Sequence, residues 1–110
     1  MLFRSRWAEL EQLAFSPSRW ERRLIGSTIA TLPFEVGPGT DLRETVRRRA
    51  LPLLGQLMGD REPDVQKALA WAWRNLVRVD TTAVEDALRA EADRAAADDD
   101  GHREIGRAHV

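Results

Sequence analysis

Two helical segments of similar pattern constrain the fold of this chain more than any other feature. They are residues 20–24 (Trp-Glu-Arg-Arg-Leu) and 65–69 (Val-Gln-Lys-Ala-Leu), which begin at positions 20 and 65, an offset of 45. Each segment follows a proline, and a longer helix-forming stretch precedes each of them. No stretch long enough to form a strand alternates polar and apolar residues. We therefore expect an all-α fold built from a repeated helical unit.

Periods of about 40–47 residues made of helix pairs are typical of HEAT and armadillo repeats. We accordingly predict stacked HEAT-like helical hairpins, a fragment of an α-solenoid. Apolar spacing, capping residues and prolines predict helices over residues 2–15, 18–32, 41–58, 64–77 and 82–97.

Prolines and capping residues set the expected helix ends. Pro33 and the Gly-Pro-Gly run after it predict that the second helix stops near Leu32. Pro52 predicts a kink or a restart inside the third helix. Capping boxes are expected where the second and the last helix begin, formed by Ser18 with Glu21 and by Thr82 with Glu85.

The last residues differ in composition from the rest. We predict one partial repeat domain over residues 1–97 and an acidic, disordered tail over residues 98–110. Residues 104–110 (Glu-Ile-Gly-Arg-Ala-His-Val) resemble the translation of sequencing-adapter DNA. We interpret these seven residues as non-native read-through.

Several classes of chemistry are excluded by what the sequence lacks. It contains no cysteine, which removes disulfides, thiolate catalysis and cysteine-bound zinc. Its two histidines, His102 and His109, lie near the C-terminus, so we expect no metal site and no histidine-assisted nucleophile in the body of the chain. No apolar run approaches 18 residues and no signal-peptide pattern occurs, so a cytoplasmic location is expected.

Charge is unevenly distributed along the chain. Residues 1–79 carry 13 Lys or Arg against 9 Asp or Glu, whereas residues 80–110 carry 4 against 9. A basic body favours a phosphate-rich partner such as DNA, although an arginine-rich surface can also be merely solvated.

The helix over residues 64–77 has two contrasting faces. Its predicted core stripe is Val65, Leu69, Ala72 and Leu76, and Trp73 adjoins this stripe. The opposite face combines three cations with an indole, a set suited to phosphates and a sugar: Lys67, Trp71, Arg74 and Arg78. The alternative is that Trp71 packs against a neighbouring repeat.

The second helix begins with Arg19, Arg22 and Arg23 around Trp20. Arg23 takes the repeat position that Ala68 fills in the other segment, so we expect its guanidinium to point into a groove, where it could hold a phosphate. The alternative is a salt bridge to a nearby acid. Trp20 is expected to pack at the start of the helix.

Two motifs resemble the DNA alkylation repair family, the AlkD-like DNA glycosylases built from HEAT-like repeats. The family pattern is a Trp-x-Arg-Arg helix start followed by a later Gln-Lys-Ala-x-x-Trp-Ala-x-Arg helix. Both occur here in order, within residues 16–23 and 64–75, and the resemblance covers about residues 8–90.

This resemblance implies hydrolysis of the N-glycosidic bond of N3- or N7-alkylated purines in duplex DNA, without base flipping. Arg23 matches the family arginine expected to hold a phosphate, and Trp71 matches a catalytic-site tryptophan that contacts the deoxyribose beside the lesion. We expect no cofactor and, at full length, a monomer. The other predicted DNA-binding residues are Arg19, Arg22, Lys67, Arg74 and Arg78.

The family's catalytic aspartate lies on an earlier helix, and Trp7, Glu9 and Glu11 do not match that motif. The chain therefore resembles the C-terminal half of such an enzyme, and we expect that it does not excise bases by itself. Two alternatives remain: a protein-interaction scaffold made of HEAT repeats, and a non-catalytic relative that binds duplex DNA.

Overall fold

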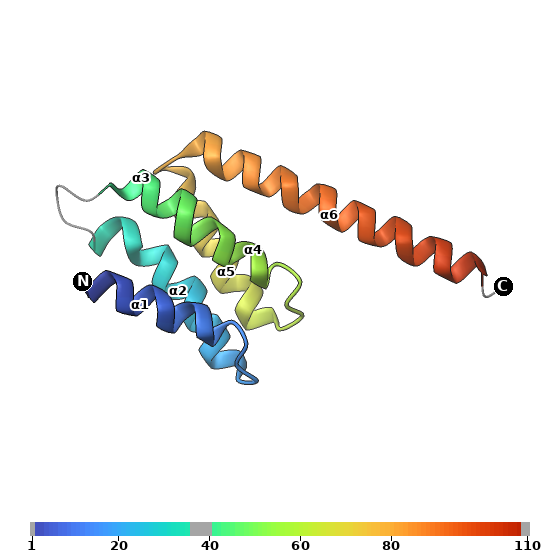
Figure 1. Ribbon diagram of the computed structural model, residues 1–110, viewed down its shortest axis with the longest axis horizontal. Helices are drawn as coiled ribbons and strands as arrows, with labels where there is room; N and C mark the ends of the chain where they lie inside the picture. The colour runs from blue at the N-terminus through green and yellow to red at the C-terminus, as the bar shows by residue number, and fades with distance from the viewer. Residues whose placement is uncertain (1, 36–40, 109–110) are drawn as a thin grey trace.

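The structure, a computed structural model, describes the backbone of residues 2–35 and 41–108 and the side chains of residues 6–34 and 41–97. This described part is helical and contains no strand, which confirms the predicted all-α class (Figure 1). Its elements are α1 (Leu2–Leu13), α2 (Arg19–Glu35), α3 (Leu42–Thr45), a π-helical segment η1 (Val46–Ala50), α4 (Leu51–Leu57), α5 (Pro63–Val77) and α6 (Thr81–Ala108).

The helices form two layers, with α6 at one side. Helix α2 packs along α5, and these two make the closest pair in the molecule. Helix α1 and the α3–η1–α4 stretch lie next to each other on one side of that pair, while α6 leaves the body toward the C-terminus (Figure 1). Two helical hairpins, α1–α2 and α3/α4–α5, thus stand side by side. The predicted solenoid arrangement is compatible with this pairing and stays a prediction.

The hydrophobic core fills the space between the layers. The predicted stripe on α5 is confirmed, because Val65, Leu69, Ala72 and Leu76 are all buried. Trp73 is buried as well, and its indole N–H donates to the Met58 sulfur at 3.3 Å. The other large, fully buried side chains come from α2, η1, α4 and α6, and they are Ile25, Ile29, Val46, Leu54 and Val84.

Pro52 lies where the helix restarts, as predicted. It is in the first turn of α4, and η1 ends immediately before that helix, with the Leu51 N–H bonded to the Val46 carbonyl. Proline lacks an N–H, and its ring collides with the carbonyl four residues earlier. The wider π turn accommodates that ring without breaking the helical path.

The expected stop at Pro33 is wrong, because α2 continues through it to Glu35. Pro33 leaves the Ile29 carbonyl without its helical N–H donor, and the carbonyls on either side of it accept hydrogen bonds from side chains. The Thr31 hydroxyl donates to the Thr28 carbonyl at 3.1 Å, and the Asn75 amide donates to the Ala30 carbonyl at 2.7 Å. Only two residues of helix follow Pro33, so little regular structure depends on the missing bond.

Both predicted ends of the last helix are also wrong. Helix α6 begins at Thr81, and its N-cap is Asp80, whose Oδ1 accepts the Ala83 N–H at 3.1 Å. Thr82 therefore lies inside the helix and does not cap it. Helix α6 also runs past Ala97 to Ala108, because alanine, arginine and glutamate favour helix and each of its two glycines, Gly101 and Gly106, costs only about 1 kcal/mol. The domain boundary at residues 97/98 stays a prediction.

Within the described residues, no helix is both long and apolar enough to cross a lipid bilayer.

Candidate nucleic-acid interface

The close parallel packing of α2 and α5 determines which side chains can form a site. A Cβ placed on Gly26 would lie 2.8 Å from the Ala68 carbonyl carbon and Cβ, so the two backbones nearly touch there. Further along, Asn75 reaches the Ala30 carbonyl. Because both contacts advance in the same chain direction, the helices run parallel. The two helices therefore share one surface. We call the line along which they touch the seam.

Helical spacing then shows which residues share the solvent side of this seam. On α5, the core residues Leu69 and Leu76 lie to one side of Ala68, and Trp71 lies to the other. On α2, the core residues Ile25 and Ile29 lie to one side of Gly26, and Arg23 lies to the other. Because the two helices are parallel and share one core, the side of α2 that carries Arg23 and the side of α5 that carries Trp71 face solvent on the same surface of the molecule. We call this surface the α2–α5 face. Its exposed cations and tryptophans are Arg19, Trp20, Arg23, Lys67, Trp71, Arg74 and Arg78, and the same stripes also carry the exposed Phe34 and the half-buried Asp64.

The face thus brings together all the predicted DNA-binding residues except Arg22. Arg23 on α2 and Trp71 on α5 both lie on the solvent side of the seam, and Trp71 is 42% exposed. The partial exposure of Trp71 leaves an indole surface available to a ligand. Packing against a neighbouring repeat remains compatible with the same exposure.

Trp20 differs from expectation. It was expected to pack at the helix start, but its side chain is 55% exposed. The Arg19 guanidinium carbon lies 4.9 Å from the Trp20 ring centroid, and that of Arg23 lies 5.9 Å from it. Both are within the range of cation–π attraction. Arginines at one residue before and three residues after a tryptophan are the sequence signal that could have revealed this contact.

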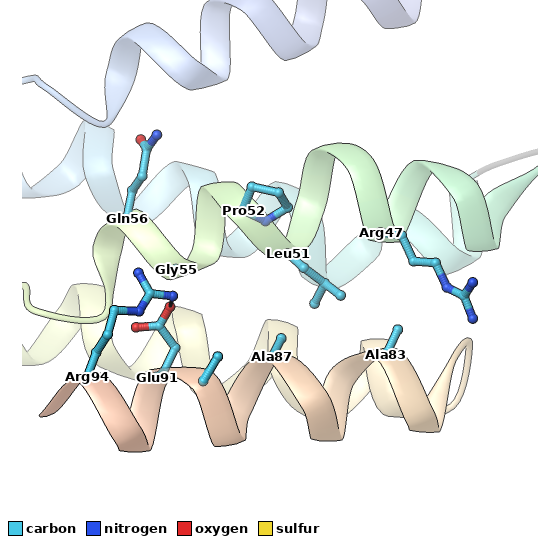
Figure 2. A pocket seen from close by; sticks show the side chains of 10 residues that line it. Arg47, Leu51, Pro52, Gly55, Gln56, Ala83, Ala87, Glu91 and Arg94 are labelled. Carbon is cyan, nitrogen blue, oxygen red and sulfur yellow. Dashed lines mark hydrogen bonds and ion pairs between the residues drawn. The ribbon is translucent and has the colours of Figure 1, made fainter. Parts of the chain in front are cut away.

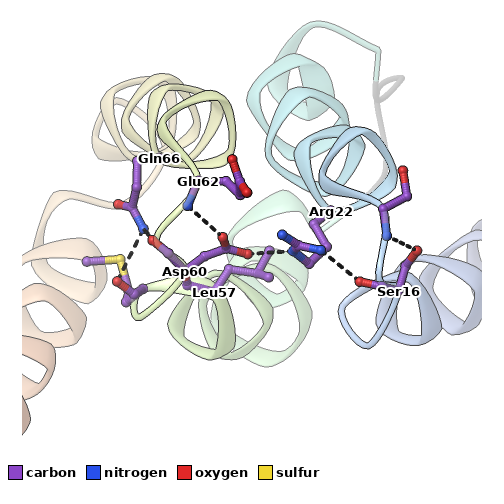
Figure 3. Close-up of polar contacts among 8 residues, drawn as sticks. Ser16, Arg22, Leu57, Asp60, Glu62 and Gln66 are labelled. Atoms are coloured by element: carbon purple, nitrogen blue, oxygen red, sulfur yellow. Dashed lines mark hydrogen bonds and ion pairs between the residues drawn. The ribbon is translucent and has the colours of Figure 1, made fainter.

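Arg22 points away from the face and joins two loops (Figure 3). Its Nε donates to Asp60 Oδ2 at 2.6 Å and its Nη1 donates to the Ser16 carbonyl at 2.9 Å. Asp60 Oδ1 also accepts the Glu62 N–H at 3.0 Å. Through Arg22, Asp60 therefore links the α4–α5 loop to the loop before α2. Gln66 adds hydrogen bonds from its amide to the carbonyls of Asp60 and Met58.

These contacts change the titration of the pair. Burial would raise the pKa of Asp60, but hydrogen bonds from Arg22 and from the Glu62 N–H, together with the Arg22 charge, hold that pKa below its usual value. The hydrogen bond to Asp60 likewise raises the pKa of Arg22. The ion pair thus stays charged at neutral pH and acts as a structural link.

A similar ion pair secures the start of α6. Arg47 Nε donates to Asp80 Oδ2 at 2.7 Å, while Asp80 also caps the helix. The hydrogen bond from Arg47, assisted by the Ala83 N–H, holds the pKa of Asp80 below its usual value. Asp80 is buried, with 6% of its surface exposed, and both of its carboxylate oxygens accept hydrogen bonds.

The two sides of the molecule balance their charge differently. None of the five cations of the α2–α5 face forms a salt bridge with a side chain that the structure describes. Unbalanced positive charge beside exposed indoles favours an anionic partner with flat or apolar groups. On the opposite side, by contrast, three consecutive arginines are paired: Arg47 with Asp80, Arg48 with Glu44 and Arg49 with Glu11.

A cavity of about 540 Å³ between α4 and α6 is a weaker candidate site (Figure 2). Its walls are largely apolar and include Leu51, Pro52 and Ala87. The arginine at one end is Arg47, bound to Asp80, and at the other end Arg94 pairs with Glu91. Its charges are therefore balanced. Among the described residues, no group of three or more acidic or histidine side chains could hold a metal ion.

The family model described as "DNA alkylation repair enzyme" matches residues 2–98, which is most of the chain. The chain belongs to the DNA alkylation repair enzyme family. This confirms the resemblance found in the two motifs and connects the protein with DNA alkylation repair. No curated protein and no solved structure matches the chain at a significant level.

Proposed function

We propose that this DNA alkylation repair protein binds duplex DNA with its α2–α5 face. The observation that carries the proposal is the gathering of five cations, none paired with a described carboxylate, around the exposed indoles of Trp20 and Trp71. Arg23, Lys67, Arg74 and the other cations of the face would neutralise phosphates and release counterions. Arg22 serves the face indirectly, because its bond to Asp60 fixes the start of α2.

The reaction that this surface would serve is hydrolysis of the N-glycosidic bond of an N3- or N7-alkylated purine. Such a base carries a positive charge, so it can leave with the electron pair of the C1′–N bond and become neutral. The sugar passes through an oxocarbenium ion, which a water molecule captures at C1′ with loss of a proton. Trp71 would lie against that sugar, where its π face stabilises the developing positive charge.

The carboxylate on the same stripe of α5 is Asp64, which lies in the first turn, seven residues before Trp71. Seven residues correspond to about 10 Å along a helix, too far for Asp64 to orient a water molecule at the sugar that Trp71 would contact. We therefore propose that the chain alone binds the duplex and contacts the sugar but does not release the base. This assigns DNA binding to the present residues and leaves water activation to a group outside this face.

Two measurements on the same chain test the proposal. Fluorescence anisotropy with a labelled duplex should show affinity that falls with salt, with a log–log slope of about −4.5 if the five cations reach phosphates. Chromatography should detect no free base from a duplex that contains 7-methylguanine. Salt-independent or absent binding would favour the protein-interaction scaffold, whereas release of 7-methylguanine would contradict the division of roles proposed above.

A further inference from the structure

Trp20 is the exposed residue whose role the proposed function leaves open. It occupies the second position of α2 and is 55% exposed, so it contributes little to the core. Its ring nevertheless has two cationic neighbours, since the guanidinium carbons of Arg19 and Arg23 lie 4.9 and 5.9 Å from its centroid. An exposed indole with an arginine on each side along the helix requires a reason other than packing.

The first turn of α2 separates its three arginines into two groups. Arg22 turns toward Asp60 and the Ser16 carbonyl, where its side chain is only 17% exposed. Arg19 and Arg23 stay at the surface on either side of Trp20 and form no salt bridge with a described side chain. The indole is therefore the contact that restrains these two guanidinium groups.

Restraint by an aromatic face suits an arginine that must bind an anion. A cation–π contact uses the flat face of the guanidinium and leaves its N–H edge available to phosphate oxygens. A side chain that is already restrained also loses less conformational entropy when it binds. An ion pair with a carboxylate would restrain the arginine too, but it would occupy the same N–H groups.

We propose that Trp20 is a positioning residue, which holds Arg19 and Arg23 as a preformed pair of guanidinium groups for neighbouring phosphates of one DNA strand. This inference rests on the proposed function, because it assigns the partner of the pair as the duplex backbone. It predicts that Trp20 acts through the two arginines. Direct stacking of Trp20 on a base or sugar is the competing role.

A double-mutant cycle on the full chain separates these roles. The variants are Trp20→Leu, Trp20→Phe, Arg19→Gln combined with Arg23→Gln, and the triple variant. Phe15→Leu is the matched control, since Phe15 is 84% exposed and lies outside the α2–α5 face. Each variant is measured for duplex affinity by anisotropy at several salt concentrations and for helix content by circular dichroism.

We expect Trp20→Leu to weaken duplex binding about fivefold and to make the salt slope less steep, with unchanged helix content. Trp20→Phe should retain most of the affinity because it keeps a π face. In the chain that lacks both arginines, Trp20→Leu should have no further effect. In the chain without DNA, NMR should show ring-current shifts for the side-chain protons of Arg19 and Arg23. Trp20→Leu should abolish these shifts.

Three outcomes would overturn the inference. Trp20→Leu could match Phe15→Leu in affinity, or it could cost the same factor with and without the arginines, which would mean direct stacking on DNA. Either result leaves the proposed function standing. If the unchanged chain shows no salt-dependent duplex binding, the proposed function and the role of Trp20 fail together.

Discussion

Gly26 lies against the backbone of Ala68 so closely that no side chain fits between α2 and α5. A Cβ at position 26 would be 2.8 Å from the Ala68 carbonyl carbon. This contact brings the two helices that carry the cations and indoles to one seam. Glycine is required there because its neighbour is backbone, which cannot move without separating the helices.

Gly26→Ala should destabilise the protein by about 1–3 kcal/mol, the usual cost of overpacking, and should weaken duplex binding because the seam widens. Gly55→Ala is the matched control. Its Cβ would meet the Glu91 carboxylate at 2.8 Å, the end of a flexible side chain that can move, and alanine favours helix. Urea unfolding should show a lower midpoint for Gly26→Ala alone. Equal midpoints for both variants would contradict the tight contact at Gly26.

Arg23→Ala should weaken duplex binding about tenfold and reduce the magnitude of the salt slope by about 0.9, because one phosphate contact is lost. Its unfolding midpoint should not change, since Arg23 is exposed and forms no described salt bridge. Arg22→Ala should behave differently and lower the midpoint, because it leaves Asp60 without its partner. Anisotropy and urea unfolding on the two variants check this separation. If Arg23→Ala and Arg22→Ala changed duplex affinity and the unfolding midpoint in the same way, the two arginines would share one role.

Trp71→Ala should lose more affinity for a duplex with a cationic sugar mimic than for one with a neutral abasic site. The indole stabilises positive charge at the sugar, and a pyrrolidine ring in the strand imitates that charge, whereas tetrahydrofuran does not. Trp71→Phe should restore part of the preference. Competition anisotropy with the two duplexes measures the ratio. An unchanged ratio in Trp71→Ala would assign this indole to packing.

Acid should destabilise the protein through Asp60. Its folded pKa is depressed, so its contribution to stability is complete above the unfolded pKa of about 3.9 and is lost as pH falls through the lower folded pKa. Asp60→Asn should therefore be less stable than the original chain at pH 7, and the gap should narrow toward pH 3. Urea unfolding between pH 7 and pH 3 measures this difference in the free energy of unfolding, and Asp93→Asn is the control for loss of an exposed charge. A gap that is constant with pH would exclude the Arg22 ion pair as its source.

Some parts of the candidate site could be predicted from helix periodicity alone. The spacing of Lys67, Trp71 and Arg74 against the stripe of Leu69 and Leu76 follows from the 3.6-residue turn, and the burial of the stripe was confirmed. The exposure of Trp20 could not be predicted this way. Whether an indole at a helix start is buried depends on which element lies above it, and periodicity within one helix does not contain that information.

Residues a few positions apart were enough to predict the all-α class and the apolar face of α5, and two short motifs were enough to indicate the family, but the ends of α2 and α6 were not predicted correctly. Tertiary structure alone decided that Arg22 is held by Asp60 while Arg23 stays on the surface, although the two are adjacent in sequence. Neighbouring residues on a helix point about 100° apart, so their partners come from different parts of the fold. Only the packing of α2 along α5, with Gly26 at its closest point, determines which arginine meets the interior and which is left to meet an anion.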